Sequence, residues 1–316
     1  MLYDQHHIQL KPLIKALPVS PTAHQRRPTL IGATAVLIWS TLALLSDLSG
    51  AIPPFQLTAM AFTLAFGLGI AMQISAGDRP LAGLRLSTPV WAIGICGLFG
   101  YHFAYFVALQ NAPVIEASLI SYLWPLLIVF FSALLPGERL RWFHSAGAIA
   151  GFLGALVIIT KGQPLTQALT LDPQYALGYL AAFLSALIWS SYSVLSRRFG
   201  EVPTSAVGGF CGVTAVLAWL CHFGLEQTVS PIGWEWGAIA GLGLGPVGLA
   251  FFTWDYGVKH GNIKILGTLS YAAPLLSTLL LIACGLAEPS PSVFTACGLI
   301  VGGALLSMLD VFKPGI

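Results

Sequence analysis

Apolar runs of about twenty residues recur ten times along this 316-residue chain, and short turn signals separate them. A helix needs about 20 mainly apolar residues to cross the hydrocarbon of a bilayer. Only 8% of the residues are charged, too few to cover a soluble globule of this size. Strands are disfavoured because the runs are long and do not alternate polar with apolar residues. The sequence therefore predicts an all-α polytopic membrane protein with ten transmembrane helices, at residues 28–48, 54–75, 88–109, 114–136, 140–161, 175–199, 203–227, 233–258, 262–285 and 290–312.

The basic residues predict the orientation, because cytoplasmic loops of membrane proteins are enriched in Lys and Arg. With an internal N-terminus, 13 of the 14 Lys and Arg residues fall on the cytoplasmic side, and only Lys161 falls outside. We therefore expect both termini to be cytoplasmic. The polar residues 1–27 read as a tail rather than a signal peptide, since the first apolar run is too long for one.

The two halves of the chain share short strings in register. Ile38-Trp39-Ser40 recurs 150 residues later as Ile188-Trp189-Ser190, and Pro125-Leu126-Leu127 recurs 149 residues later as Pro274-Leu275-Leu276. Five runs per half is an odd number, so the second copy enters the membrane from the opposite side, and such inverted repeats are typical of transporters. The predicted divisions are a cytoplasmic tail 1–27, a first five-helix repeat 28–161, a periplasmic linker 162–174, a second five-helix repeat 175–312 and a cytoplasmic end 313–316.

These motifs resemble the drug/metabolite transporter superfamily of the EamA type. The resemblance covers residues 28–312 and includes Pro136-Gly137-Glu138-Arg139-Leu140 ahead of a glycine-rich run. It implies a transporter with ten short spans. Within the superfamily, one set of aromatic residues resembles that of the bacterial aromatic amino acid exporters: Trp39, His102, Tyr105, Tyr122, Trp124 and Trp189.

Trp39, Trp124 and Trp189 lie near the middle of their runs, whereas tryptophan is usually found at membrane interfaces. An indole N–H at that depth needs a partner. Two interpretations stay open, core packing between helices and the lining of a substrate cavity. His102 is either a neutral, hydrogen-bonded side chain or a proton carrier. The full set predicted to line the cavity is Trp39, His102, Tyr105, Tyr122, Trp124, Trp189, Trp254 and Tyr271.

Prolines and glycines inside the runs predict local breaks. Pro125 and Pro274 each remove a helical N–H, so both are candidate hinges for alternating access, with a static kink as the alternative. The stretch 243–248 matches GxGxxG, but no strand precedes it, so we expect a loosened or closely packed helix there instead of a dinucleotide site. The GxxxG pairs Gly147/Gly151 and Gly298/Gly302 predict close helix packing.

Charged residues are absent near the centres of the apolar runs, which limits the classes of substrate that the protein could carry. All fourteen Lys and Arg lie at or beyond the run ends, which disfavours phosphorylated substrates, and the small net charge of +2 disfavours nucleic acid. No Walker A, GxSxG or HExxH motif is present, so we expect no enzyme, cofactor or metal. The five cysteines are expected to be free and buried. The sequence predicts an exporter of aromatic and other hydrophobic amino acids that works as a monomer; the alternatives are an exporter of aromatic drugs or cationic dyes and, more remotely, an intramembrane enzyme.

Overall fold

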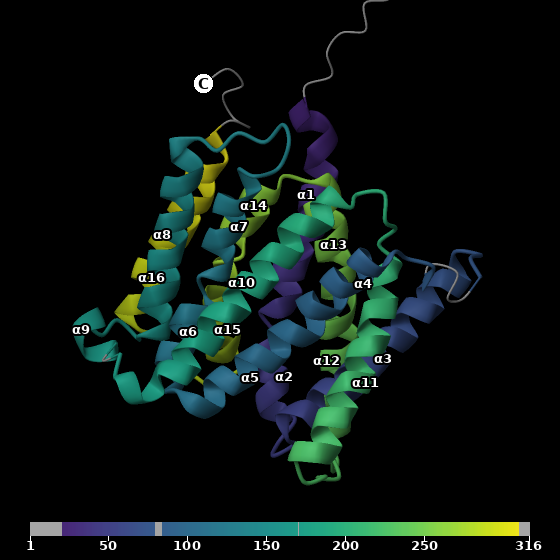
Figure 1. Cartoon of the computed structure of the whole chain (residues 1–316). Coiled ribbons are helices and arrows are strands. Elements are labelled where there is room, and N and C mark those ends of the chain that lie inside the picture. Colours follow the sequence, from purple (N-terminus) through teal and green to yellow (C-terminus); the bar gives the residue numbers. More distant parts are fainter. Residues whose placement is uncertain (1–20, 80–83, 170, 310–316) are drawn as a thin grey trace, which may run out of the picture.

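The computed structural model describes residues 21–79, 84–169 and 171–309, with side chains from residue 25 onward, and regular structure in this part of the chain is entirely helical (Figure 1). Predicted features at residues 1–20 and 310–316 lie outside the described residues. The α-helices are α1 (Pro21–Trp39), α2 (Leu42–Leu48), α3 (Pro54–Ser75), α4 (Thr88–Ile95), α5 (Tyr101–Asn111), α6 (Val114–Ser121), α7 (Trp124–Ser132), α8 (Trp142–Ile159), α9 (Leu165–Ala168), α10 (Ala176–Arg198), α11 (Ala206–Leu225), α12 (Glu235–Leu244), α13 (Ala250–His260), α14 (Ile263–Leu269), α15 (Ala272–Ala283) and α16 (Pro291–Ser307).

Nine helical segments of the described chain are long and apolar enough to cross a membrane. They correspond to the first nine predicted runs. The tenth run appears as α16, an apolar helix of 17 residues that is slightly shorter than the other nine. Large apolar side chains such as Leu134, Phe223 and Phe294 are more than 70% exposed, which suits contact with lipid and not with water. The first helix begins at Pro21, earlier than the predicted start at residue 28.

Several of these segments are interrupted near their centres, and two pairs of interruptions fall at matching places in the two halves. The break between α1 and α2 has no counterpart, because α10 is continuous. A π-helical turn, η2 (Cys96–Gly100), separates α4 from α5, and η4 (Gly245–Leu249) separates α12 from α13. Non-helical residues 122–123 separate α6 from α7, and residues 270–271 separate α14 from α15. The predicted loosening at residues 243–248 is therefore present as a π-turn, a feature that is frequent at functional sites.

Helix packing also follows the two halves. The most extensive contacts join α8 with α16, α3 with α11, α1 with α13, and α5 with α10. Glycines allow three of these crossings, because Gly257 lies on Gly32, Gly208 on Gly69 and Gly303 on Gly147, so close that a Cβ would collide. The α1–α13, α3–α11 and α8–α16 pairs are visible side by side in Figure 1.

Two expectations from the sequence need correction. Gly147 and Gly151 do pack closely, but nothing lies within 4 Å of a Cβ placed at Gly298 or Gly302, so that GxxxG pair faces away from its neighbours and Gly303 makes the contact instead. All five cysteines are free, but Cys96, Cys284 and Cys297 are exposed and only Cys211 is fully buried. Both errors have one cause: in a lipid-facing helix, small and apolar residues occupy the outer surface as readily as the core.

Candidate functional site

Four tryptophans from four separate segments meet at the centre of the molecule. Their ring centroids lie 5.1–6.4 Å apart, and each of the four rings contacts the other three. Most of these contacts are edge-to-face, the arrangement that aromatic quadrupoles favour. We call Trp39, Trp124, Trp189 and Trp254 the tryptophan cluster.

The helix interruptions position the cluster. Trp39 is the last residue of α1 and Trp124 the first of α7, so each ring sits where a helix breaks. The Trp39 indole N–H donates to the carbonyl of Pro246 at 3.0 Å, inside the π-turn η4. The Trp254 indole N–H donates to Ser193 Oγ at 3.1 Å. One carbonyl of the irregular turn, that of Pro246, is thus satisfied by the cluster itself.

The other two tryptophans differ in their hydrogen bonding. Within the described residues, neither the Trp124 nor the Trp189 indole N–H has a hydrogen-bond acceptor. Both side chains are at least nine-tenths buried. Two donors therefore remain available at the centre of a cluster in which charged groups are absent.

A second layer of rings adjoins the cluster on the α5 side. Tyr101 contacts Trp189 at 5.5 Å and stacks on Tyr105 at 6.1 Å, with the rings nearly parallel. His102 lies between Phe62 and Phe251, at 5.1 and 6.3 Å. Its Nδ1 is 2.7 Å from the carbonyl of Leu98 in the π-turn η2, so Nδ1 is the protonated nitrogen, because a carbonyl can only accept.

Among the described residues, Tyr122 and Tyr271 make no ring contact with the tryptophan cluster. Both belong to a neighbouring apolar cluster formed by α7, α8, α15 and α16. Tyr271 is fully buried against Gly151, and its hydroxyl accepts the backbone N–H of Leu126 at 3.0 Å. That N–H belongs to the residue after Pro125, so the tyrosine of one half occupies the helix break of the other.

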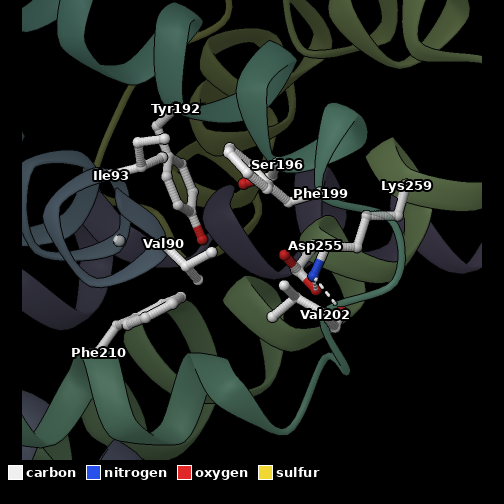
Figure 2. Close-up of a pocket in the computed structure, with 10 residues that line it drawn as sticks. Val90, Ile93, Tyr192, Ser196, Phe199, Val202, Phe210, Asp255 and Lys259 are labelled. Carbon is white, nitrogen blue, oxygen red and sulfur yellow. Dashed lines mark hydrogen bonds and ion pairs between the residues drawn. The ribbon is translucent and has the colours of Figure 1, made fainter. Parts of the chain in front are cut away.

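A small hollow of about 20 Å³, enough for one water, lies beyond Trp189. Tyr192, whose ring contacts Trp189 at 5.4 Å, lines it together with Asp255 and Lys259 (Figure 2). Asp255 and Lys259 form an ion pair of 2.8 Å, and the Thr204 hydroxyl donates to the same carboxylate at 2.8 Å. These two charges are therefore paired within the protein, as their spacing of four residues suggests.

The structure brings together six of the eight predicted residues: the four tryptophans, with His102 and Tyr105 in the adjoining layer. It adds Phe62, Tyr101 and Phe251, which the sequence analysis did not select. Phe251 precedes Trp254 by three residues and so shares its helix face, a spacing that could have revealed it. Phe62 offers no such signal, since phenylalanine is common in apolar runs.

Comparison with known proteins agrees with this architecture. The sequence profile of the EamA-like transporter family matches residues 27–160 and again residues 176–309. A protein of Ancylobacter novellus named aromatic amino acid exporter YddG is 55% identical over 281 residues, which cover 89% of this chain and 96% of that protein. The Escherichia coli (strain K12) protein of the same name is 25% identical and covers 90% and 98% of the two chains.

More distant similarity extends to other transporters. A biotin transporter of Escherichia coli (strain K12) is 27% identical over 55% of this chain and 58% of its own length. Among solved structures, one described as "Crystal structure of protein" is 54% identical, covers 90% of this chain and 98% of that chain, and superposes with a TM-score of 0.85.

Proposed function

The chain belongs to the EamA-like transporter family, and from this premise we propose that it exports aromatic and other hydrophobic amino acids from the cytoplasm. The protein is a multi-pass transporter of the bacterial inner membrane. The substrate class rests on two grounds, the names of its YddG relatives and the tryptophan cluster.

The proposal includes a specific architecture. Ten transmembrane helices form two inverted five-helix repeats, 28–161 and 175–312, joined by a periplasmic linker 162–174; the tail 1–27 and the end 313–316 are cytoplasmic. The distribution of Lys and Arg supports this orientation. The helix contacts also support a pseudo-two-fold axis. In the two repeats α1 corresponds to α10, and α13 corresponds to α5, so the α1–α13 pair has the α10–α5 pair as its counterpart. The α8–α16 and α3–α11 pairs each join corresponding helices of the two repeats, as such an axis requires.

The observation that favours an aromatic substrate most strongly is the meeting of four uncharged aromatic rings from both halves at one central point. The proposed substrate-binding residues are Trp39, His102, Tyr105, Tyr122, Trp124, Trp189, Trp254 and Tyr271. The rings now fill the space between them, so a substrate ring binds by displacing part of this packing. We expect it to enter on the side of the half-buried Trp39, Tyr105 and Tyr122.

The backbone of an amino acid needs polar partners in the same place. The free indole N–H groups of Trp124 and Trp189 suit its carboxylate, in a region where Lys and Arg are lacking. The carbonyls four residues before Pro125 and Pro274 suit its ammonium, since proline leaves them without the usual helical donor. The carbonyl of Ser270 accepts the N–H of Ala273 at 3.1 Å and keeps a second lone pair.

Other functions fit these features less well. An exporter of aromatic drugs or cationic dyes would use the same rings through cation–π contacts, and it is the alternative that most needs testing. An intramembrane enzyme would need a nucleophile with a paired base, and the described part of the cluster provides none. A monomer is sufficient, because the cluster is built from a single chain.

The direct test is counterflow in proteoliposomes loaded with unlabelled tryptophan. We expect labelled tryptophan and phenylalanine to exchange rapidly, threonine more slowly, and a lipophilic cation not at all. Exchange of the cation without exchange of either aromatic amino acid would instead establish the multidrug alternative.

A further inference from the structure

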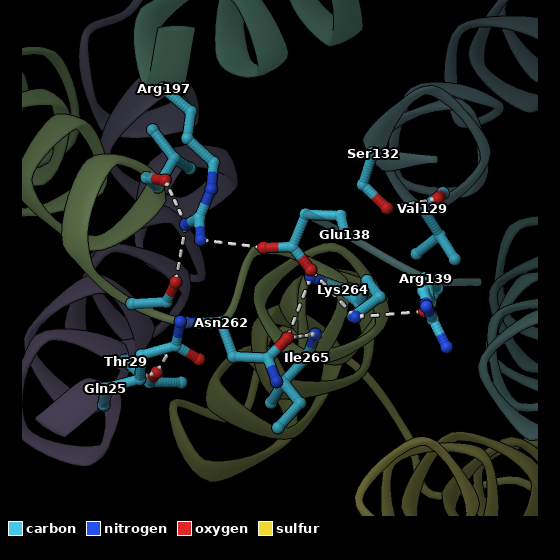
Figure 3. Close-up of polar contacts among 12 residues, drawn as sticks. Gln25, Thr29, Val129, Ser132, Glu138, Arg139, Arg197, Asn262, Lys264 and Ile265 are labelled. Carbon is cyan, nitrogen blue, oxygen red and sulfur yellow. Dashed lines mark hydrogen bonds and ion pairs between the residues drawn. The ribbon is translucent and has the colours of Figure 1, made fainter. Parts of the chain in front are cut away.

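Three charged residues from distant parts of the sequence form one ionic cluster at the end of the molecule where α1 begins and α16 ends (Figures 1 and 3). One carboxylate oxygen of Glu138 pairs with Arg197 at 2.7 Å, and the other pairs with Lys264 at 2.9 Å. The side chains are only 15%, 15% and 9% exposed, respectively. Charge-assisted bonds with so little exposure are screened much less than ordinary surface pairs.

This cluster joins the two halves of the chain. Glu138 lies between α7 and α8 of the first half, whereas Arg197 lies in the last turn of α10 and Lys264 in the first turn of α14. Arg197 also donates to the carbonyls of Val258 and Gly261, which ties the end of α13 to the same group (Figure 3). Opening the protein at this end requires these contacts to separate.

The opposite end cannot form an equivalent cluster. With offsets of 149–150 residues, the positions that correspond to Glu138, Arg197 and Lys264 are Glu288, Asp47 and Ile115. Both carboxylates are exposed, and neither forms an ion pair with another described residue. Closure at this end would therefore bring two negative charges together where the other end brings opposite charges together.

We propose that Glu138, Arg197 and Lys264 form an ionic lock on the cytoplasmic gate, and that its absence at the periplasmic gate makes the outward-open conformation the resting state. This inference rests on the alternating access and inverted repeats of the proposed function. For an exporter, the consequence is that substrate binding from the cytoplasm must await, or induce, the breaking of this lock.

The test measures both gates in the same protein by double electron–electron resonance in lipid nanodiscs. Spin labels at Trp142 and Arg198 report the cytoplasmic end. Labels at Leu48 and Phe294, near the repeat-equivalent positions, report the periplasmic end. The Trp142 and Phe294 side chains are 69% and 75% exposed, so both sites are accessible to a label. The background has its five native cysteines replaced and must retain wild-type transport. Glu138→Gln and Lys264→Met each remove charge with little change of size.

We expect each variant to shift the ratio of inward-open to outward-open populations about tenfold, which corresponds to about 1.4 kcal/mol. A long distance between two labels corresponds to an open gate. The population with a long distance must therefore rise for the cytoplasmic pair of labels and fall for the periplasmic pair. Glu201→Gln, at an exposed carboxylate of the same end, is the matched control and should change neither distribution. A change confined to the cytoplasmic pair means local loosening and overturns the proposal, as does no change at either pair.

A second variant acts from the opposite end. Asp47→Arg removes the like charge and places a guanidinium where it can pair with Glu288 when the periplasmic gate closes. We expect it to favour the same inward-open population, although the substitution is at the far side of the membrane. Failure of Asp47→Arg to open the cytoplasmic pair contradicts the proposed asymmetry. All of these distances are measured without added substrate, so the result for the lock does not depend on the amino acid specificity of the proposed function.

Discussion

Hydrogen bonding divides the four central tryptophans into two kinds. The N–H groups of Trp39 and Trp254 are engaged with Pro246 and Ser193, so these rings are held in place by the protein. Trp124 and Trp189 are held by packing alone and keep a donor for a ligand. At the level of single residues, we therefore assign orientation to the first two tryptophans and recognition to the second two.

Glu138 gives a prediction about pH. Burial disfavours its charged form, but the hydrogen bond and charge of Lys264 and the charge of Arg197 outweigh burial and lower the pKa of Glu138 below its ordinary value of 4.5. A carboxyl group with a lowered pKa stabilises the folded contact above its ordinary pKa and loses that effect as pH falls through the lowered value. We expect the gate distances of the wild type to be constant from pH 8 down to about pH 5. A change centred between pH 6 and 7 would show that another group controls the gate.

Single functional residues could be identified from the sequence where a residue type occupied an unusual depth in the membrane. Tryptophan at mid-span is unusual, so Trp39, Trp124 and Trp189 were identifiable and do meet. The partners of Glu138 were not, because Arg197 lies 59 residues away and Lys264 lies 126 residues away. Charged residues near span ends are ordinary in membrane proteins. Only the folded chain shows which of them approach each other.

At the level of helices, paired interruptions are the main feature of the fold. Pro125 and Pro274 each follow a break in the helix, and the π-turns η2 and η4 occupy matching places in two further segments. The sequence indicated three of these four sites through proline. It did not indicate η2, where residues 96–100 contain no proline and the turn is stabilised by the bond from His102 to Leu98. That bond is local, between residues four apart in the same span.

Pro125 and Pro274 give a prediction about how the helices move during transport. In Pro125→Ala and Pro274→Ala the restored N–H can bond the carbonyl four residues earlier and straighten the helix. If these positions are hinges, folding and tryptophan binding stay near normal, while the transport rate falls about 5- to 30-fold, the effect of 1–2 kcal/mol. Pro164→Ala, at the exposed start of α9, is the control and should transport normally. Unchanged rates in both hinge variants would mean that the kinks only improve packing.

At the level of the whole molecule, the fold is nearly symmetric and the charge is not. When the halves are exchanged, two of the four main helix interfaces interchange and the other two map onto themselves, and the shared strings in the sequence anticipate this. Among the described residues, the cluster of Glu138, Arg197 and Lys264 has no counterpart at the other end, so two conformations related by symmetry need not be equally stable. The sequence could predict the repeat because duplication leaves matching residues. It could not predict the balance between the ends, which depends on contacts that form only after folding.

If rings from both halves recognise the substrate, the loss of a central ring must affect an aromatic amino acid more than a small one. Counterflow of labelled tryptophan and labelled threonine is compared for the wild type, Trp124→Ala, Trp189→Ala and, as a control, Trp234→Ala, whose side chain is 90% exposed. Each lost ring pair removes roughly 0.5–1.5 kcal/mol of stacking. We predict that tryptophan exchange falls about two- to tenfold more than threonine exchange in both central variants, and that the control resembles the wild type. Equal loss for tryptophan and threonine would contradict recognition by these rings and assign the cluster to packing alone.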